Sequence, residues 1–429
     1  MKVFSMFDGV GGFIVGLNNA DSTFFQTLYS NQYEPSKKNQ DAYEIGCYQF
    51  PDIEHIPTDV SLISNEKFLE MRNNGVDMIV GGFPCQDYSV ARTKKYESGI
   101  EGKKGVLFWE IIRATKNIQP KYLILENVDR LLKSPSNQRG RDFAIMLSAF
   151  NQLNYSVEWR VINAADYGRA QRRRRIFFFI YRNDSKWSNK LDKEYENYKN
   201  LNSIDFYKSY VYQKGLFAQQ FPIKSFSSNN ISFEHLSNDL SYISNHFNIS
   251  NNKSYFYNSG IMRYGIYFSA PTEPLNDEKP ITLRNILVSE SNVPKKFFIE
   301  GIKLEKFKYL RGAKKITRKS SDGHTYTYSE GAMSEFDSVD LPGRTMLTSE
   351  GSINRSTHLL KINDKYRLLT PIEAERLQDF PDNWTKFKLT AKGNVVEVSD
   401  RMRMFCMGNA LVTGIVTRIA NGIKNIELM

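Results

Sequence analysis

The sequence predicts an α/β fold built on a buried sheet, followed by a second, loop-rich basic domain. Up to about residue 183, short apolar runs alternate with amphipathic segments, a pattern typical of βαβ units. The apolar runs are nearly continuous, which favours strands covered on both faces of a mainly parallel sheet. From 184 to about 340 this alternation stops, and Asn, Ser, Lys and Tyr become frequent.

The expected elements of the first domain, 1–183, follow one another in a regular order. KVFSMF predicts a strand, and the glycines after it lead into a helix that begins near FIVGL. Further strands are expected at 23–30, 77–83, 121–128, SVEWRVINA and RIFFFIYR, and helices at 41–50, 106–118 and 141–153.

The last segment, 341–429, is expected to return to the first domain and complete it. RLLTPIEAERLQDFP, 367–381, predicts an amphipathic helix started by a proline. MFCMGNALVTGIVTRIANGI, 404–423, predicts a strongly apolar helix that can pack against the first sheet.

Composition narrows the class of protein. A net charge of +11 favours a polyanionic partner. With 3 cysteines the chain has no disulfide framework, so a reducing compartment such as the cytoplasm is expected. No CxxC or HxxxH spacing occurs, which makes a structural metal improbable. No uncharged apolar run approaches the ~18 residues of a membrane span.

Cys85, in GGFPCQDYS, is either a small buried residue or a nucleophile. It follows the apolar run DMIVGGF rather than lying inside it, as a packing cysteine would. Ligands of open α/β sheets bind beyond the carboxyl ends of the strands, where this position falls. The basic loop that follows, 86–105, would favour a thiolate and could act as a lid. These features favour the nucleophile.

FDGVGG, 7–12, predicts a tight turn from a strand into a helix, where the main chain can approach a ligand closely. The dinucleotide pattern GxGxxG is only partly met, because Ile14 stands where its last glycine should be. The motif alone leaves a nucleotide-like cofactor and an ordinary tight turn equally open, and NAD is the weaker choice of cofactor. In such a unit the second strand ends with an acid that holds the ribose, but here Gln32 stands there. Tyr33 beside it could stack on a base.

Polar residues also end other strands of the predicted sheet. Glu126 and Asn127 end the run LILENV, so an acid joins Cys85 at one edge of the sheet. In AQRRRRIFFFI, period-2 alternation would point Arg173 and Arg175 to the same side. Paired arginines at such an edge suit an anionic or electron-rich substrate.

The motifs FDGVGG, GGFPCQ, ENV, QRRRR, RLLTPIEAERLQDFPDNW and GNALV, in this order, closely resemble those of the DNA (cytosine-5) methyltransferase family. The resemblance covers 1–182 and about 341–425. It implies a Rossmann-like, S-adenosylmethionine-dependent methyltransferase sheet over 1–183, a target-recognition domain over 184–340, and a segment over 341–429 that completes the catalytic domain.

The resemblance also implies roles for single residues. Cys85 would attack C6 of cytosine, a protonated Glu126 would contact the N3 edge, and Arg173 and Arg175 would orient the base. The residues similar to the cofactor-binding positions of the family are Phe7, Gly9, Val10, Gly11, Gly12, Gln32, Tyr33, Asp59, Pro84, Leu107, Asn409, Ala410 and Leu411. The family usually has glutamate where this chain has Gln32, so a weaker ribose contact is expected.

The expected activity is methylation of C5 of a flipped-out cytosine in double-stranded DNA, in a sequence-specific manner. The expected enzyme is a cytoplasmic, nucleoid-associated monomer of restriction–modification type, which forms no stable complex with any cognate endonuclease. Two alternatives stay open: an RNA cytosine-5 methyltransferase of the same fold, and a catalytically silent DNA-binding homologue.

Overall fold

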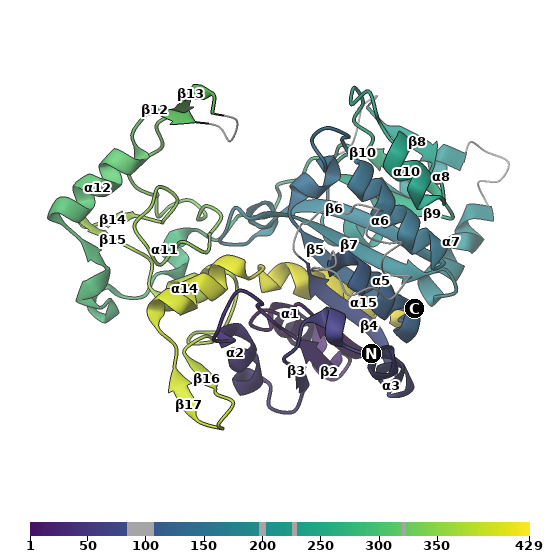
Figure 1. Ribbon diagram of the computed structural model, residues 1–429, viewed down its shortest axis with the longest axis horizontal. Helices are drawn as coiled ribbons and strands as arrows, with labels where there is room; N and C mark the ends of the chain where they lie inside the picture. Colours follow the sequence, from purple (N-terminus) through teal and green to yellow (C-terminus); the bar gives the residue numbers. More distant parts are fainter. Residues whose placement is uncertain (84–106, 197–202, 225–229, 320–322) are drawn as a thin grey trace.

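A ten-stranded sheet forms the centre of the larger of two lobes (Figure 1). The computed structural model describes residues 1–83, 107–196, 203–224, 230–319 and 323–429. The strand order is β3-β2-β1-β4-β5-β7-β6-β9-β10-β8. The strands are β1 (Lys2–Met6), β2 (Gln26–Asn31), β3 (Glu54–Ile56), β4 (Val76–Gly82), β5 (Tyr122–Asn127), β6 (Tyr155–Asn163), β7 (Arg174–Arg182), β8 (Ser232–His235), β9 (Ser259–Arg263) and β10 (Ile266–Ala270).

The sheet is parallel in one half and antiparallel in the other. β3, β2, β1, β4 and β5 run parallel, as βαβ units require. β7 then lies antiparallel between β5 and β6, and the pairs from β6 to β8 are antiparallel too. The expectation of a mainly parallel sheet thus holds only for the first half. The connection from β6 to β7, 164–173, contains no α-helix, so the two strands pair as neighbours running in opposite directions.

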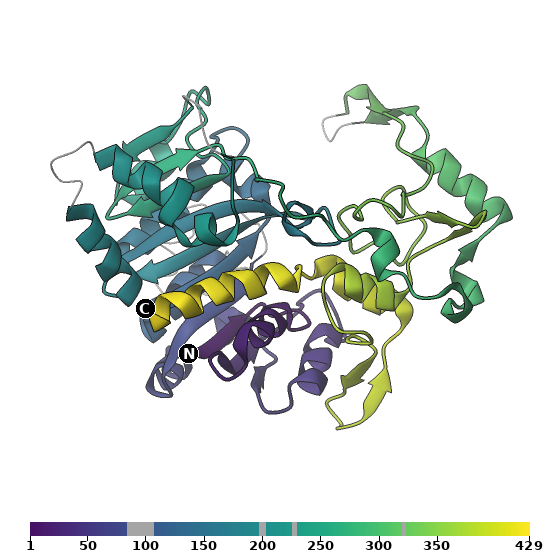
Figure 2. The same ribbon diagram turned by 180° about the vertical axis from the view of Figure 1, so that it is seen from behind.

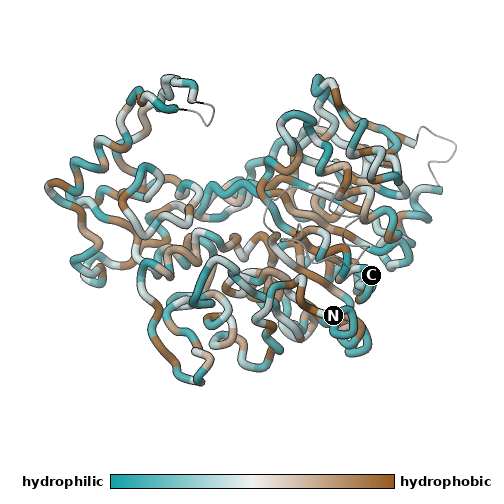
Figure 3. Tube along the Cα trace, viewed as in Figure 1, coloured by the Kyte–Doolittle hydropathy of each residue, from teal (hydrophilic) through white to brown (hydrophobic). Residues whose placement is uncertain are grey.

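Helices cover both faces of the sheet. One face packs against α3 (Asn65–Asn73), α5 (Leu107–Ile118) and α6 (Arg141–Gln152). The other packs against α1 (Gly12–Asp21), α7 (Lys186–Glu196), α8 (Ser203–Ser209), α9 (Leu216–Gln220) and α15 (Thr413–Leu428). Successive β1 residues supply both cores, Val3 one and Phe4 the other. Figure 3 shows the resulting apolar interior of this lobe in brown.

The stretch 184–340, expected as one separate domain, is divided in the structure. Its strands β8, β9 and β10 extend the large sheet beyond β6, and α10 (Leu240–His246) packs on α6. Gly260 of β9 permits this extension, because a Cβ there would lie 2.2 Å from the Trp159 ring. Short strands separated by Asn- and Ser-rich turns carry little periodicity, so the pattern of the sequence did not indicate them.

The smaller lobe is formed by the later part of this stretch together with the residues up to β15 (Figures 1 and 2). Its elements are α11 (Leu283–Ile286), β11 (Phe298–Ile299), α12 (Gly301–Arg311), β12 (Lys314–Lys319), β13 (Thr325–Glu330), β14 (Leu360–Ile362) and β15 (Lys365–Arg367). β11, β15 and β14 form a small sheet, and β12 and β13 form a separate hairpin. The two lobes join at the level of α14 and diverge beyond it (Figures 1 and 2).

The C-terminal segment departs from the expected helices in two places. The helix expected over 367–381 is α13 (Pro371–Leu377), because Thr370 caps it in a capping box with Glu373. The helix expected over 404–423 is two helices, α14 (Asp400–Asn409) and α15, since the chain becomes extended at Ala410. As expected, the second of these packs on the first domain, against α1.

The remaining elements lie beside the first strands. α2 (Asp41–Gln49) packs against the hairpin of β16 (Phe387–Leu389) and β17 (Val395–Glu397). Among the helices that the structure describes, none is long and apolar enough to span a membrane.

Candidate active site

The glycine-rich loop 7–12 joins β1 to α1 at the carboxyl edge of the sheet. Phe7, Gly9 and Gly11 have φ angles of 53°, 60° and 86°, so the chain turns through left-handed conformations that glycine adopts freely. A Cβ on Gly9 would meet nothing within 4 Å, which leaves the main chain open to a ligand there. The loop therefore has the form expected of a cofactor cradle.

The C-terminal segment closes over the other side of this loop. Trp384 donates a hydrogen bond of 2.8 Å from its Nε1 to the Val10 carbonyl. A Cβ on Gly11 would overlap the Phe50 ring at 2.5 Å, and one on Gly12 would lie 3.3 Å from Leu411. Gly11 and Gly12 are thus needed for close packing, whereas Gly9 is open.

Asp8 fixes the loop from below. Its buried carboxylate accepts hydrogen bonds from the hydroxyls of Ser5, at 2.5 Å, and Ser30, at 3.0 Å. Burial raises the pKa of this carboxyl, and the two hydroxyl bonds oppose the rise. Asp8 therefore ties the ends of β1 and β2 together beneath the loop.

Gln32 and its neighbours stand at the end of β2, as the sequence predicts. The Gln32 side-chain oxygen accepts a 2.8 Å hydrogen bond from the main-chain N–H of Gly9, so it touches the loop directly. Tyr33 is 40% exposed beside it. Asp59 caps a short helical turn, because its side chain accepts hydrogen bonds from the main-chain N–H and the hydroxyl of Ser61.

Gln32→Glu is expected to bind S-adenosylhomocysteine about fivefold more tightly. A carboxylate can keep the Gly9 bond with one oxygen and accept ribose hydroxyls with the other, and charge assistance adds about 1 kcal/mol. Isothermal titration calorimetry measures the change. Glu34→Gln, which removes the charge of the acid two residues further along the chain, is the matched control and should leave affinity as it was. Unchanged or weaker binding by Gln32→Glu would show that this position does not face the ribose.

Glu126 and Arg175 form an ion pair at the edge of the sheet. Arg175 Nε lies 2.9 Å from Glu126 Oε1, and both side chains are largely buried, with exposures of 19% and 14%. Glu126 Oε2 lies over Gly82, where a Cβ would be 3.3 Å away. Burial raises the pKa of the Glu126 carboxyl, while the charges of Arg175 and Arg173 lower it. A carboxyl in this setting can hold a proton more readily than an exposed one.

The end of β4 lies against the end of β5. Asn127 donates a 2.9 Å hydrogen bond to the Phe83 carbonyl, two residues before Cys85 in the chain. Pro84, Cys85 and the loop 86–105, expected to supply the nucleophile and a lid, lie outside the described residues. Leu107 begins α5 and packs against the core beneath the sheet.

Arg173 lies close to Glu126 but is bonded elsewhere. It is buried, and its two terminal nitrogens donate to the carbonyls of Met346, at 3.0 Å, and Gly408, at 3.2 Å. Burial and the nearby charge of Arg175 lower its pKa to about 9. It precedes β7, which begins at Arg174, so strand alternation does not relate it to Arg175. Its bonds join the sheet edge to the smaller lobe and to α14.

Two glutamines complete this junction. Gln171 donates to the Leu377 carbonyl and accepts from the Met346 N–H. Gln378 donates to the Met407 carbonyl at 2.7 Å and to the Ala410 carbonyl at 3.4 Å. These bonds fix the end of α14 at Asn409 and the residues between α14 and α15, which include Ala410 and Leu411.

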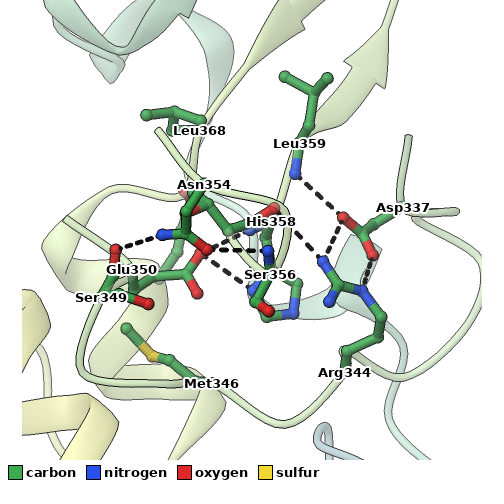
Figure 4. Close-up of polar contacts among 12 residues, drawn as sticks. Asp337, Arg344, Met346, Ser349, Glu350, Asn354, Ser356, His358, Leu359 and Leu368 are labelled. Carbon is green, nitrogen blue, oxygen red and sulfur yellow. Dashed lines mark hydrogen bonds and ion pairs between the residues drawn. The ribbon is translucent and has the colours of Figure 1, made fainter. Parts of the chain in front are cut away.

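A network of polar side chains near Met346 stabilises the smaller lobe (Figure 4). Asp337 pairs with Arg344 and Arg311 and accepts the Leu359 N–H. These guanidinium groups hold the pKa of the Asp337 carboxyl well below its usual range against the opposing effect of burial. The loop 346–358 is further held by a 3.0 Å hydrogen bond between Glu350 and His358. These contacts therefore hold the loops of the smaller lobe in fixed positions where the lobe joins the edge of the large sheet.

Several residues that build the site escaped the sequence prediction. Asp8 and Trp384 hold the glycine-rich loop, and Gln171 and Gln378 hold the segment above it. All four stand inside the motifs FDGVGG, QRRRR and RLQDFPDNW or directly beside them. An acid in a strand-ending glycine loop is the signal that could have identified Asp8.

The fold and the arrangement at the sheet edge define a Rossmann-like methyltransferase. A solved structure supports the fold: a DNMT2 mutant from Spodoptera frugiperda aligns with a TM-score of 0.55 and 12% identity, over 100% of this chain and 99% of that one. The chain belongs to the C-5 cytosine-specific DNA methylase family, whose model matches residues 1–425. It is a DNA cytosine-5 methyltransferase of restriction–modification type.

Relatives of this family differ in how much of the chain they match. The type II methyltransferase M.Sau3AI of Staphylococcus aureus is 51% identical over 428 residues, 100% of this chain and 96% of that protein. The type II methyltransferase M.HhaI of Haemophilus parahaemolyticus is 31% identical over 184 residues, 43% of this chain and 50% of that protein.

Proposed function

We propose that this enzyme transfers a methyl group from S-adenosylmethionine to C5 of a flipped-out cytosine in double-stranded DNA, through a covalent adduct between Cys85 and C6. The observation that carries the proposal is the buried Glu126–Arg175 pair beside the end of β4. It sets an acid and a cation at the point where the chain leads into Cys85.

Cytosine C5 lies in an aromatic ring and is a poor nucleophile. Attack of the Cys85 thiolate forms the S–C6 bond and moves ring electrons toward N3, which leaves C5 enamine-like. Glu126 delivers a proton at N3 as that charge develops, and Arg175, which is paired with Glu126, would bind the neighbouring carbonyl of the base. Transfer of the methyl group to C5 would break its bond to the sulfonium sulfur and leave S-adenosylhomocysteine. Loss of the C5 proton then expels the Cys85 thiolate, and return of the N3 proton to Glu126 restores the neutral aromatic ring.

The glycine-rich loop fits S-adenosylmethionine, which supplies an electrophilic methyl group when bound. Gly9 leaves room for a ligand against the main chain, and the Gln32 oxygen stands beside it for the ribose. Tyr33 and Asp59 are candidates for contact with the adenine. Asn409 and Ala410 are candidates for contact with the side of the cofactor that the C-terminal segment covers. Asp8 and Trp384 keep the loop in place without needing to touch the cofactor.

In duplex DNA the neighbouring bases cover C5 and C6 of the target cytosine. The base must therefore rotate out of the duplex, at a cost of a few kcal/mol. The smaller lobe supports target recognition, because it is joined to the sheet edge through Arg173 and Gln171. The net charge of +11 favours the DNA backbone. We expect a monomer that binds DNA near the nucleoid without a stable complex with its endonuclease.

Duplex DNA containing 5-fluorocytosine tests the proposal, because fluorine at C5 blocks the release step. Incubation with S-adenosylmethionine should give a protein–DNA adduct that survives denaturation and is absent in Cys85→Ser. Absence of an adduct on any duplex would refute the proposal. Methylation of RNA alone would select the RNA enzyme, and DNA binding without methylation would select a silent homologue.

A further inference from the structure

The hairpin of β12 and β13 projects from the smaller lobe with both faces uncovered. Every residue from Thr325 to Ser329 is exposed, and so are Lys315, Thr317, Arg318 and Lys319. Both views show it at the top of the smaller lobe, above α12 (Figures 1 and 2). An isolated two-stranded hairpin is marginal in water, so a long uncovered one suggests a surface shaped for a partner.

The antiparallel register divides the hairpin into two chemically different faces. The register pairs Ile316 with Tyr328 and Arg318 with Tyr326, which places these residues on one face. There the Arg318 guanidinium lies 3.9 Å from the centre of the Tyr328 ring, so this face is packed by its own side chains.

The opposite face, which we call the hydroxyl face, carries short hydroxyls between two ammonium groups and no carboxylate. It consists of Lys315, Thr317, Lys319, Thr325, Thr327 and Ser329. The acid of the two described strands, Glu330, belongs to the packed face and is already paired with Lys314 and Arg355. The hydroxyl face is therefore positive and rich in groups that can both donate and accept hydrogen bonds.

The hairpin is fixed at its base. Lys314 donates to the carbonyls of Tyr309 and Leu310, which end α12. Arg355 donates to the Gly331 carbonyl and pairs with Glu330, so the supporting loop holds the other strand. The hydroxyl face is thus held in a defined direction while its side chains remain available.

We propose that the hydroxyl face enters the major groove of the target DNA and reads base edges there, with Lys315 and Lys319 contacting the flanking phosphates. The inference rests on the proposed function and assigns its sequence-reading surface. A major groove about 12 Å wide admits a two-stranded β-ribbon. Threonine and serine hydroxyls can contact several base edges, and the threonine methyl can contact the thymine methyl group.

Two double variants separate sequence-specific contacts with the bases from electrostatic attraction to the phosphates. Thr317→Val with Thr327→Val removes hydroxyls while it keeps side-chain shape, and is expected to reduce discrimination between the preferred site and its single-base variants about tenfold. Lys315→Ala with Lys319→Ala is expected to weaken binding to all sequences alike and to flatten the slope of log K against log salt by about 1–2.

Tyr326→Phe is the matched control, because it removes a hydroxyl from the packed face of the same hairpin. It is expected to leave site preference unchanged. Site preference is measured by conversion sequencing of a randomised duplex library methylated by each variant, and thermal melting verifies folding.

An unaltered site preference in the folded valine variant would overturn the proposal while the enzyme remains a DNA methyltransferase. Unaltered affinity and salt slope in the lysine variant would overturn it as well and would indicate a protein partner for this face. Failure of the unmodified enzyme to methylate any duplex would instead refute the proposed function.

Discussion

Glu126→Gln is expected to lower the rate of methyl transfer by about 10²–10³-fold while binding of DNA and S-adenosylhomocysteine is retained. The amide keeps the size of the side chain and can still contact the base, but it has no acidic proton to deliver as charge develops at N3. The ion pair with Arg175 is lost at the same time. Single-turnover methylation under saturating DNA and cofactor measures the step directly.

The dependence on pH gives this prediction a second signature. Burial raises the pKa of Glu126 above its ordinary value of 4.5. If the protonated form is required, the rate falls as the pH rises through this raised pKa. Glu126→Gln does not titrate there, so its small residual rate should lose that limb. A limb that persisted in the variant would assign the titration to another group.

Asp129→Asn is the matched control for the loss of charge. Asp129 pairs with Arg174 at the same edge of the sheet, but their side chains are 39% and 59% exposed. Exposed pairs contribute little, so this variant should methylate at close to the unmodified rate. A comparable loss of rate in Asp129→Asn would mean that the general charge of the edge, and not the proton of Glu126, is responsible.

The sequence predicted the strand ends of the first domain better than it predicted the elements that follow residue 183. Glu126, Gln32 and the 7–12 loop lie at strand ends, where apolar runs terminate, and this signal is local. The parallel half of the sheet followed from the same pattern. Cys85 was predicted as the nucleophile for the same reason, and this stays a prediction because the residue lies outside the described part of the chain.

Features that depend on contacts between distant segments could not be predicted in this way. An apolar run predicts one helix over 404–423, but Gln378 binds the Met407 carbonyl and the chain opens at Ala410. Likewise, four arginines in a row look alike, yet Arg173 is buried against the carbonyls of two other segments and Arg174 is an exposed surface residue. Periodicity carries no information about such partners.

The run RLLTPIEAERLQDFPDNW illustrates how one motif combines stability with function. Its second half bonds Trp384 to Val10 of the 7–12 loop and Gln378 to the Met407 carbonyl of α14. Its first half contains a buried pair, in which both terminal nitrogens of Arg367 bond the two oxygens of Glu373, at 2.8 Å and 2.7 Å. Glu373 also accepts the N–H groups of Thr370 and Val288, so this pair fixes the start of α13 against the smaller lobe.

Arg367→Met is therefore expected to lower the free energy of unfolding by about 3–5 kcal/mol, because it leaves the carboxylate of Glu373 buried without its cation. Urea denaturation followed by tryptophan fluorescence measures the loss. Glu373→Gln added to Arg367→Met should recover part of this loss, since a neutral amide is easier to bury and can still accept the hydrogen bond from the Thr370 N–H.

Arg284→Met, which breaks the exposed pair with Asp340, is the matched control and should not shift the unfolding transition measurably. Equal effects of Arg367→Met and Arg284→Met would show that the buried pair does not stabilise this junction.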